Sequence, residues 1–515
     1  MKLNRKKVII AVGCCLITGV LVAGSSVIGV SLKKNVKNGV ISGTKSVTLW
    51  YTDSEMKDYL GSAAKAYEKE YHVQVLPVQK SGKEFLQAVN KASLQGGADM
   101  PDLYFITNDA LEQATLAGLS SPVQDDGKVL NTANFPQSAL SAVTYHGQKV
   151  AYPVYYDTSV LIYNKNYLED YAEEMLQAES DKTDGEEAQK EAETETAAAG
   201  TTTAGTTTAG SAAADGESAS SGTDASFSKE QIQKEAQKYI PATITDLENF
   251  ADEYDAPQKV QSVFKWDVSD ILENYGLIGN YMNIGGENGD DSSQIDIYNE
   301  NTIRCLQAFQ KLSQFFSIDA SAVSKEGVVQ DFENGKIVFM IADADAVQEL
   351  ETAKADGTMP YEYGTAKLPG LSEKLQSRPL SVTGTLVVNG YSEEKVQANE
   401  FAAFLTTKYC NELYPAAGKI SGNLQASLPY ETMGTYREEY AASEPIPKMM
   451  STSNLWMKMS VGLIHIWNGS DPNAEWKSIS ESAVSQITGK PYTEKEIQVE
   501  TETQSTQAND GGGNN

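Results

Sequence analysis

The sequence GQKVAYPVYYDTSVLIYNK, from Gly147 to Lys165, contains two strand-like segments with a polar interruption between them. The halves VAYPVYY and SVLIYNK are rich in β-branched and aromatic residues, which are typical of strands. Asp157 and two small hydroxyl residues separate the halves, next to Tyr155 and Tyr156. The pattern predicts two consecutive strands that present an aspartate and aromatic rings where one strand ends and the next begins.

Strand and helix patterns alternate on both sides of this stretch. Val47 to Tyr51 reads as a short apolar strand, followed by the helical pattern YLGSAAKAYEKEY and a second strand, HVQVLPV. Such a β-α-β unit builds parallel sheets. Asp102 to Ile106, and later KIVFMI and TGTLVVN, read as further strands. Because 515 residues exceed one simple core, we expect an α/β protein of two lobes between which the chain crosses more than once.

The charge balance excludes nucleic acid as a partner. There are 41 Lys and Arg residues against 70 Asp and Glu residues, which gives a net charge of −29, whereas phosphate contacts need a basic face. Nucleophile-elbow, P-loop, dinucleotide and zinc-protease motifs are missing, and the three histidines are isolated. We therefore expect no metal, no cofactor and no enzymatic activity, and we expect Cys305 and Cys410 to be buried free thiols.

The N-terminus predicts export. MKLNRKK precedes an uncharged run from Val8 to Leu32 that is long enough to cross a bilayer, with the basic residues on the cytoplasmic side. Residues 1–40 are predicted to be a membrane anchor or signal segment with its linker, so that the rest lies on the extracellular face. An uncleaved anchor is favoured, while the small residues near Ala23 and the Gly13-Cys14 pair leave cleavage and lipidation as alternatives.

Two low-complexity segments lack large apolar residues. The first, residues 172–238, is rich in alanine, threonine and glycine and is predicted to be a disordered insertion. The second, residues 496–515, is predicted to be a disordered tail. Neither segment is expected to contribute to chemistry.

Polar residues recur just after the predicted strands. Asp53 follows VTLWYT, Asn108 and Asp109 follow DLYFIT, and Asp343 and Asp345 follow or closely succeed KIVFMIA. In open α/β sheets, ligands bind outside the carboxyl ends of strands. Together with Asp157, these positions predict that several strand ends face one ligand cleft.

The ordered set of these segments resembles the extracellular solute-binding proteins of ABC importers, in the sugar-binding group that includes maltose-binding protein. The resemblance covers most of Val47 to about Gly489, apart from the insertion. Its marks are VTLWYTDSE, GGADMPDLYFITNDALEQATLAGL, YHGQKVAYPVYYDTSVLIYNKNYL, PATITDLENFADE, NIGGENGDDSSQIDIYNENTIRCLQAF, FENGKIVFMIADADAVQEL, YGTAKLPG and SVTGTLVVNGYSEEKVQANEFAAFLT.

The resemblance implies a two-lobed periplasmic-binding-protein-like fold of type II, in which each lobe has a mainly parallel sheet flanked by helices. Residues 41–156 and 366–412 would form the first lobe, and residues 157–365 and 413–495 the second. AYPVYYDTSVLIYNK resembles the first hinge crossover, which would place Tyr155, Tyr156 and Asp157 at the cleft floor.

The resemblance also implies a set of ligand-binding residues. Asp345 stands where relatives have a stacking tryptophan and Ile106 where they have another ring, so Trp266 is expected to restore one platform. The full predicted set is Asp53, Ser54, Glu55, Asn108, Asp109, Tyr155, Tyr156, Asp157, Trp266, Asp343, Asp345 and Trp456.

The leading hypothesis is a monomeric, membrane-tethered protein that captures a carbohydrate and delivers it to the permease subunits of an ABC importer. A cationic solute such as a polyamine is an alternative ligand, because carboxylates and aromatic rings also enclose ammonium groups. A cell-surface glycosidase using two of the carboxylates and a surface adhesin are alternatives of other classes.

Overall fold

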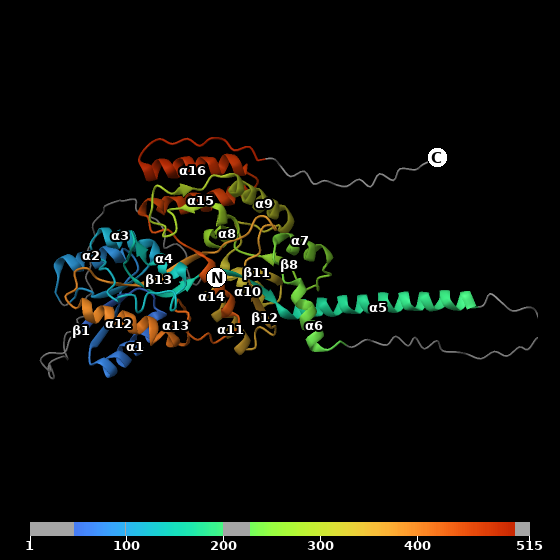
Figure 1. Ribbon diagram of the computed structural model, residues 1–515, viewed down its shortest axis with the longest axis horizontal. Coiled ribbons are helices and arrows are strands. Elements are labelled where there is room, and N and C mark those ends of the chain that lie inside the picture. The colour runs from blue at the N-terminus through green and yellow to red at the C-terminus, as the bar shows by residue number, and fades with distance from the viewer. Residues whose placement is uncertain (1–45, 98, 199–226, 500–515) are drawn as a thin grey trace, which may run out of the picture.

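The computed structural model describes residues 46–97, 99–198 and 227–499. The predicted N-terminal anchor, the centre of the insertion and the tail from residue 500 lie outside the described residues. The described chain forms two sheets side by side, each covered by helices (Figure 1). This is the α/β architecture predicted from the alternation of strand and helix patterns.

The first sheet contains the predicted β-α-β unit. β1 (Ser46–Tyr51) lies parallel to β2 (Gln74–Gln79) and to β3 (Leu103–Thr107), while β13 (Leu380–Val388) runs antiparallel between β3 and β6 (Tyr152–Asp157). The order is β14-β6-β13-β3-β1-β2, with β14 at Ile420–Ser421 and β15 (Glu444–Pro445) paired to β13. The helices packed around this sheet and beside it are α1 (Met56–Tyr71), α2 (Phe85–Gln95), α3 (Leu111–Leu116), α4 (Gln137–Ala142), α12 (Lys395–Thr407), α13 (Leu413–Ala417) and α14 (Met433–Ala442).

The second sheet has the order β12-β7-β11-β8. Its strands are β7 (Ser159–Asn164), β8 (Ser262–Lys265), β11 (Ile337–Asp343) and β12 (Tyr363–Ala366). Its side chains alternate between two cores: Val160 and Ile162 join one apolar cluster and Leu161 joins the other. Buried residues of α10 (Lys325–Glu333) and α11 (Asp345–Ala355) belong to the first cluster, and those of α7 (Ile244–Glu253), α8 (Ile271–Ile278) and α9 (Glu300–Phe316) to the second.

The chain passes between the sheets where the sequence predicts a crossover. β6 ends at Asp157 and β7 begins at Ser159, so the two strands of the opening stretch belong to different sheets. Thr158 lies between them, and its hydroxyl donates to the Leu380 carbonyl at 3.1 Å, at the start of β13. This hydrogen bond attaches the crossover between β6 and β7 to the start of β13.

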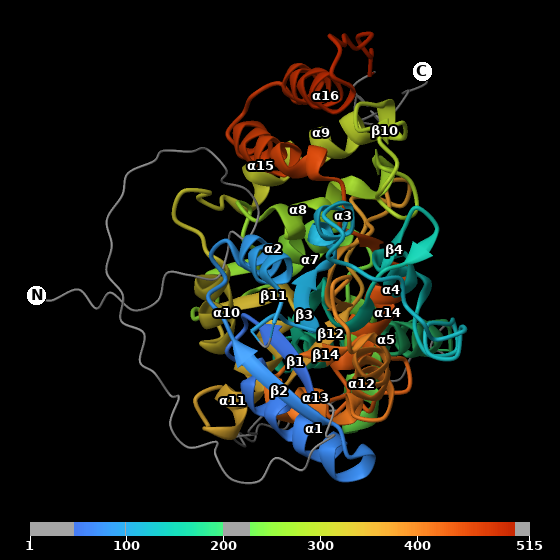
Figure 2. The same cartoon turned by 90° about the vertical axis from the view of Figure 1, so that its left-hand side faces the viewer.

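A helical cap covers the second core at one end of the molecule. α15 (Ser453–Trp467) and α16 (Pro472–Thr488) pack on each other and against α9, as Figures 1 and 2 both show. Small two-stranded sheets, β4 (Thr144–Tyr145) with β5 (Gln148–Lys149) and β9 (Asn283–Ile284) with β10 (Ile295–Asp296), complete the fold.

Strand pairing and packing differ from the predicted lobe boundaries. β14 and β15, both within the range 413–495 assigned to the second lobe, pair with β6 and β13 of the first sheet. Leu368 and Leu371, within the range 366–412 assigned to the first lobe, pack in the core of the second. A strand of two residues and a loop have no periodic pattern, so their sequences do not reveal which sheet they join.

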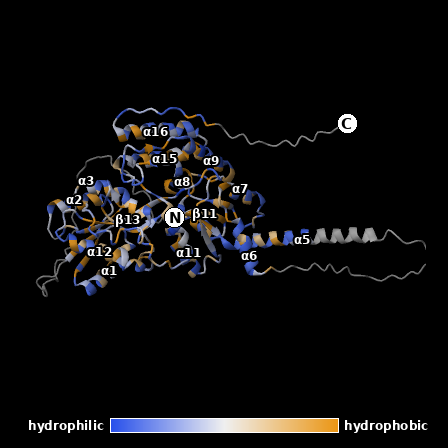
Figure 3. Cartoon of the chain, in the orientation of Figure 1, coloured by the Kyte–Doolittle hydropathy of each residue, from blue (hydrophilic) through white to orange (hydrophobic). Residues whose placement is uncertain are grey.

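The predicted insertion is partly helical, which corrects the expectation of disorder from residue 172 onward. α5 (Lys165–Ala198) continues through this range and projects from the body beside α6 (Lys229–Ala236), whose residues are mostly hydrophilic (Figure 3). Alanine, glutamate, lysine and glutamine are good helix formers, so a sequence with few apolar residues still forms a helix here.

The predicted tail also begins later than residue 496. The Ile497 N–H donates to the Tyr298 hydroxyl at 3.1 Å, and the Asn473 side-chain amide donates to the Ile497 carbonyl at 2.7 Å. Cys305 and Cys410 are buried free thiols, as predicted. Within the described ranges, no helix has both the length and the apolar character needed to cross a bilayer.

Lys448 connects the two lobes and gives stability a specific pH dependence. Its fully buried ammonium donates to the carbonyls of Ser141, at 2.8 Å, and Asn288. Burial lowers the pKa of Lys448 from 10.5 to about 8. At a pH between about 8 and about 10.5, Lys448 is mostly protonated in the unfolded chain and mostly neutral in the folded protein. Lys448 should therefore make the free energy of unfolding rise with pH over this range.

Urea denaturation of the wild type and of Lys448→Met at about pH 7 and about pH 10 checks this expectation. The difference in unfolding free energy between the two proteins should shift in favour of the wild type at the higher pH. A difference that does not change with pH would show that the ammonium is not desolvated in the folded protein.

Candidate functional site

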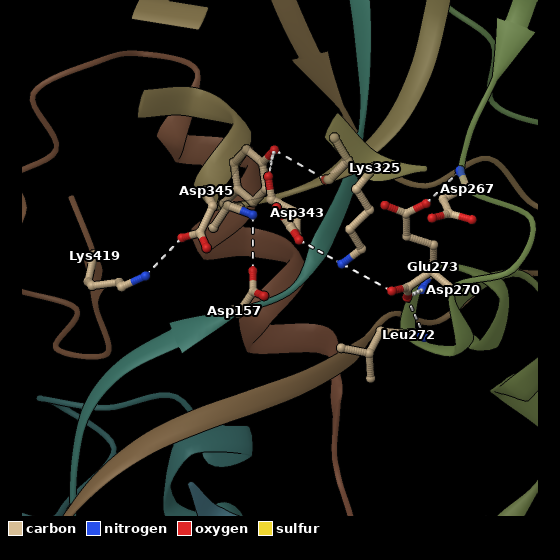
Figure 4. A network of polar contacts seen from close by, with 12 residues as sticks. Asp157, Asp267, Asp270, Leu272, Glu273, Lys325, Asp343, Asp345 and Lys419 are labelled. Atoms are coloured by element: carbon tan, nitrogen blue, oxygen red, sulfur yellow. Dashed lines mark hydrogen bonds and ion pairs between the residues drawn. The ribbon is translucent and has the colours of Figure 1, made fainter. Parts of the chain in front are cut away.

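Loops after strands of both sheets meet around Lys419, which lies directly before β14. Its Nζ lies 2.9 Å from Glu55 Oε2, in the loop after β1. It also lies 3.1 Å from Asp345 Oδ1, at the start of α11 (Figure 4). The lysine side chain is 14% exposed. These ion pairs connect the carboxyl end of a strand in the first sheet to that of a strand in the second.

The first-sheet side of this junction is the loop from Asp53 to Glu55. Asp53 Oδ1 accepts a hydrogen bond from the Glu55 N–H at 2.9 Å, which fixes the turn into α1, and Ser54 is exposed. The carboxylate of Glu55 is half exposed despite its ion pair. The loop therefore presents oxygen acceptors to the space beside Lys419.

A second lysine forms ion pairs with carboxylates of the second lobe. Lys325 Nζ lies 2.8 Å from Asp343 Oδ2 and 3.2 Å from Asp270 Oδ2 (Figure 4). Glu273 lies close by and is buried; its Oε2 accepts from the Asp267 N–H at 3.0 Å. Burial raises the pKa of Glu273 well above its usual value. Asp343 is thus already paired within its own lobe.

Asp157 occupies the crossover itself. Its Oδ1 accepts a hydrogen bond from the Ala344 N–H at 3.0 Å, which joins the end of β6 to the beginning of α11. Burial raises the pKa of Asp157 well above its usual value, the negative charges of Asp343 and Asp345 add to the effect, and Lys325 opposes it. The side chain links the two sheets and lies next to the other strand-end carboxylates.

Tyr155 is an aromatic residue near these charged groups. The ring lies directly on Gly384 of β13, where an added Cβ would come within 2.2 Å of the ring. Burial and the nearby Asp53 raise the pKa of Tyr155 to about 12, so its hydroxyl stays protonated at neutral pH. It can donate a hydrogen bond to a ligand oxygen.

Substituting Gly384 should therefore disturb this site. Gly384→Ala forces the Tyr155 ring or the strand to move, and such overpacking costs about 1–3 kcal/mol of unfolding free energy. Ligand affinity should fall together with stability. Gly61→Ala in α1, where an added Cβ meets nothing within 4 Å, is the matched control and should leave both unchanged or raise stability slightly. Thermal unfolding and ligand titration of both variants measure these effects, and equal behaviour of the two would contradict them.

Tyr156 points away from this site, because successive side chains of a strand face opposite sides. It is 2% exposed and stacks on Tyr440 of α14, with ring centroids 3.8 Å apart and planes at 3°. Its predicted place at the ligand surface is not supported by this packing.

Asn108 and Asp109 also have other partners. Asn108 is fully buried: its amide donates to the Ile446 carbonyl at 2.7 Å and its carbonyl oxygen accepts from the Thr383 N–H at 2.9 Å. Asp109 Oδ1 accepts from the Thr107 hydroxyl at 2.5 Å. Asn108 therefore holds β13 and the segment after β15 together, and we assign it a structural role.

Both predicted tryptophans pack in the second core. Trp266 is fully buried; its Nε1 donates to Asn274 Oδ1 at 2.9 Å, and its ring meets Trp467 edge to face at 5.4 Å. Trp456 is 5% exposed and packs on Tyr275, with centroids 5.6 Å apart. Neither ring offers an open face for a ligand, so the expected platform at Trp266 is corrected to a core position.

Sequence reasoning missed Lys419 and Lys325. Lys419 follows Gly418, whose φ of 65° suits a glycine, and precedes a strand of only two residues. Lys325 opens α10 as an ordinary helical lysine. The one available signal was the excess of strand-end carboxylates, which need cations when they are brought together.

Two surface hollows lie away from this junction. One, of about 260 Å³, is lined by residues near Tyr152 and Asn399 of the first lobe. The other, of about 320 Å³, lies between α15 and α16 beside Met457 and Ile479. Neither is lined by the strand-end loops described above. Among the described residues, no group of three or more His, Cys, Asp or Glu side chains is arranged to hold a metal ion.

The chain is similar in sequence to two curated binding proteins. It shares 21% identity over 455 residues with the maltodextrin-binding protein MdxE of Bacillus subtilis, which covers 85% of this chain and 89% of that protein. It shares 21% identity over 430 residues with a maltooligosaccharide ABC transporter solute-binding lipoprotein of Streptococcus pneumoniae, covering 81% of this chain and 82% of the relative. No family model matches the chain.

Solved structures show the same fold. The maltose-binding periplasmic protein MalE of Listeria monocytogenes, solved in complex with maltose, superimposes with a TM-score of 0.63 at 20% identity over 88% of this chain and 100% of that chain. A cyclo/maltodextrin-binding protein complexed with maltotetraose gives a TM-score of 0.63 at 16% identity, over 88% and 98%. The type II fold and the resemblance to sugar-binding solute-binding proteins are confirmed.

Proposed function

We propose that this chain is an extracytoplasmic solute-binding protein that captures a carbohydrate between its two lobes and delivers it to the permease subunits of an ABC importer. The observation that carries the proposal is the junction at Lys419, where strand ends of both sheets meet. Its relatives are named for binding maltodextrin and maltooligosaccharide. A site between two lobes suits a protein that closes around its ligand.

The junction offers the groups that recognise sugar hydroxyls. Carboxylates of Asp53, Glu55 and Asp345 accept hydrogen bonds, whereas Lys419 and the Tyr155 hydroxyl donate them. A hydroxyl can donate to one such group while it accepts from another. Tyr155 supplies a ring, although the two tryptophans expected to stack on sugars lie in the core. We therefore expect a site dominated by hydrogen bonds, with binding and no bond cleavage.

The cellular setting is part of the same proposal. One relative is named a lipoprotein. The basic residues and the apolar run Val8 to Leu32 support attachment to the extracellular face of the cell membrane, through an anchor or a lipid.

A cationic solute is the second candidate ligand. Four strand-end carboxylates, those of Asp53, Glu55, Asp343 and Asp345, lie near the ammonium groups of Lys325 and Lys419 in the described structure. A net negative site attracts amines as well as hydroxyls.

Isothermal titration calorimetry of the full-length chain in mild detergent tests the proposed function. Maltotriose should give a saturable heat with one site per chain, and spermidine should give none. Saturable binding of spermidine without any binding of maltotriose would reject the carbohydrate and support the cationic solute.

A further inference from the structure

The ammonium of Lys419 neutralises strand-end carboxylates of both lobes. It is held between Glu55 Oε2 and Asp345 Oδ1 at 2.9 and 3.1 Å, with one carboxylate from each lobe. We propose that Lys419 determines specificity: it replaces a ligand cation within the site, so that the site accepts neutral, hydroxyl-rich ligands and rejects amines. This inference rests on the proposed function, because it concerns the choice of ligand at the same site.

The backbone around Lys419 fixes the position of its side chain. Gly418 has a φ of 65°, and an added Cβ would come within 2.0 Å of Gln348 Oε1 on α11. On the other side, Ile420 and Ser421 pair with Tyr156 and Tyr155 of the crossover strand. The lysine is thus held between the helix of one lobe and the sheet of the other, and its charge acts on Tyr155.

The charge of this lysine is permanent at physiological pH. Burial alone would lower the pKa of Lys419, but the carboxylates of Asp345 and Glu55 outweigh it and raise the pKa above its usual value. A ligand ammonium entering the same space would meet this fixed positive charge and would compete with it for the same oxygens. The fixed charge therefore disfavours amines.

A hydroxyl-rich ligand gains from the same arrangement. An ammonium has three N–H donors, and the ion pairs with Glu55 and Asp345 use two of them. The third donor can serve a ligand oxygen. Because Glu55 and Asp345 are 50% and 56% exposed, their remaining lone pairs can accept from ligand hydroxyls.

The other lysine of the region does not have this role. Lys325 pairs with Asp343 and Asp270, both from the second lobe. Its removal changes the charge of one lobe and leaves the bridge between lobes in place. Lys419 is the lysine whose ion pairs, in the described structure, join strand ends of both sheets.

Calorimetric titrations of the full-length chain with maltotriose and with spermidine test the proposal in four proteins. Lys419→Met removes the charge and keeps the apolar stem, whereas Lys419→Arg keeps the charge. Lys408→Met removes a lysine that is 61% exposed and pairs with Glu70 at 3.3 Å, and serves as the charge-matched control.

We expect Lys419→Met to show saturable spermidine binding, which the wild type lacks, and to bind maltotriose at least about tenfold more weakly than the wild type. The Arg variant and Lys408→Met should keep the wild-type preference. An unchanged preference in a folded Lys419→Met protein would overturn the proposal. If that variant fails to fold, as judged by circular dichroism, Lys419→Gln replaces it with the same expectations.

The two proposals fail in different ways. If the wild type binds no maltotriose, the proposed function fails, and a gain of spermidine binding in Lys419→Met still supports the electrostatic role of the lysine. If the wild type binds spermidine while Lys419 is in place, the lysine does not exclude amines and the inference is overturned. If the wild type binds maltotriose and the Met variant binds it equally well, only the inference fails.

Discussion

Replacing Trp266 by alanine should lower the free energy of unfolding by about 3–5 kcal/mol, the largest effect on stability expected here. The ring is fully buried, lies 4.9 Å from Phe264 and 5.4 Å from Trp467, and donates its N–H to Asn274. Its removal leaves a cavity in the second core and an amide oxygen without its partner. Urea denaturation measures the loss.

The same variant tests whether Trp266 is a core residue or a residue that stacks on the ligand. At a temperature where it remains folded, Trp266→Ala should bind ligand about as well as the wild type. Trp266→Phe, which keeps most of the apolar volume, should lose less stability than the alanine variant. Near-normal stability combined with lost ligand binding would show that Trp266 contacts the ligand, as the sequence predicted.

Replacing Asp157 by alanine should weaken maltotriose binding about thirtyfold, equivalent to about 2 kcal/mol. The carboxyl group joins β6 to the Ala344 N–H at the crossover and lies among the strand-end carboxylates. Its loss removes a hydrogen-bonding group and loosens the link between the two sheets. Calorimetric titration gives the change in affinity.

Two further variants control for this effect. Asp157→Asn keeps an oxygen that can accept from Ala344, so the lobes should stay linked and affinity should fall less than in the alanine variant. Asp356→Ala, at the exposed far end of α11, should bind like the wild type. If Asp157→Ala binds maltotriose as tightly as the wild type, the crossover is not part of the ligand-binding site.

The sequence predicted the strands and the crossover because their signals are local. The apolar run from Val47 to Tyr51 is enough to indicate a buried strand. The polar interruption at Asp157 likewise marks where one strand-like segment ends and the next begins. The placement of Asp53, Glu55 and Asp345 after strands followed from the general geometry of α/β sheets.

The sequence did not predict how individual side chains are used, because this depends on contacts between distant residues. A tryptophan fills a core as readily as it stacks on a sugar, and Trp266 meets Trp467, which lies some two hundred residues later. Asn108 follows a strand like the other polar residues, yet its amide is occupied by Thr383 and Ile446. Lys419 lies in a turn, and its ion-pair partners Glu55 and Asp345 come from two segments far away in the sequence.

Hydrogen–deuterium exchange of the full-length chain, with and without saturating maltotriose, tests most directly whether the ligand binds between the lobes. We predict slower amide exchange on ligand binding in residues 53–57, 155–158, 343–347 and 418–421 together, because these segments from both lobes surround the junction. Slower exchange confined to one lobe, or to the hollow between α15 and α16, would contradict this prediction.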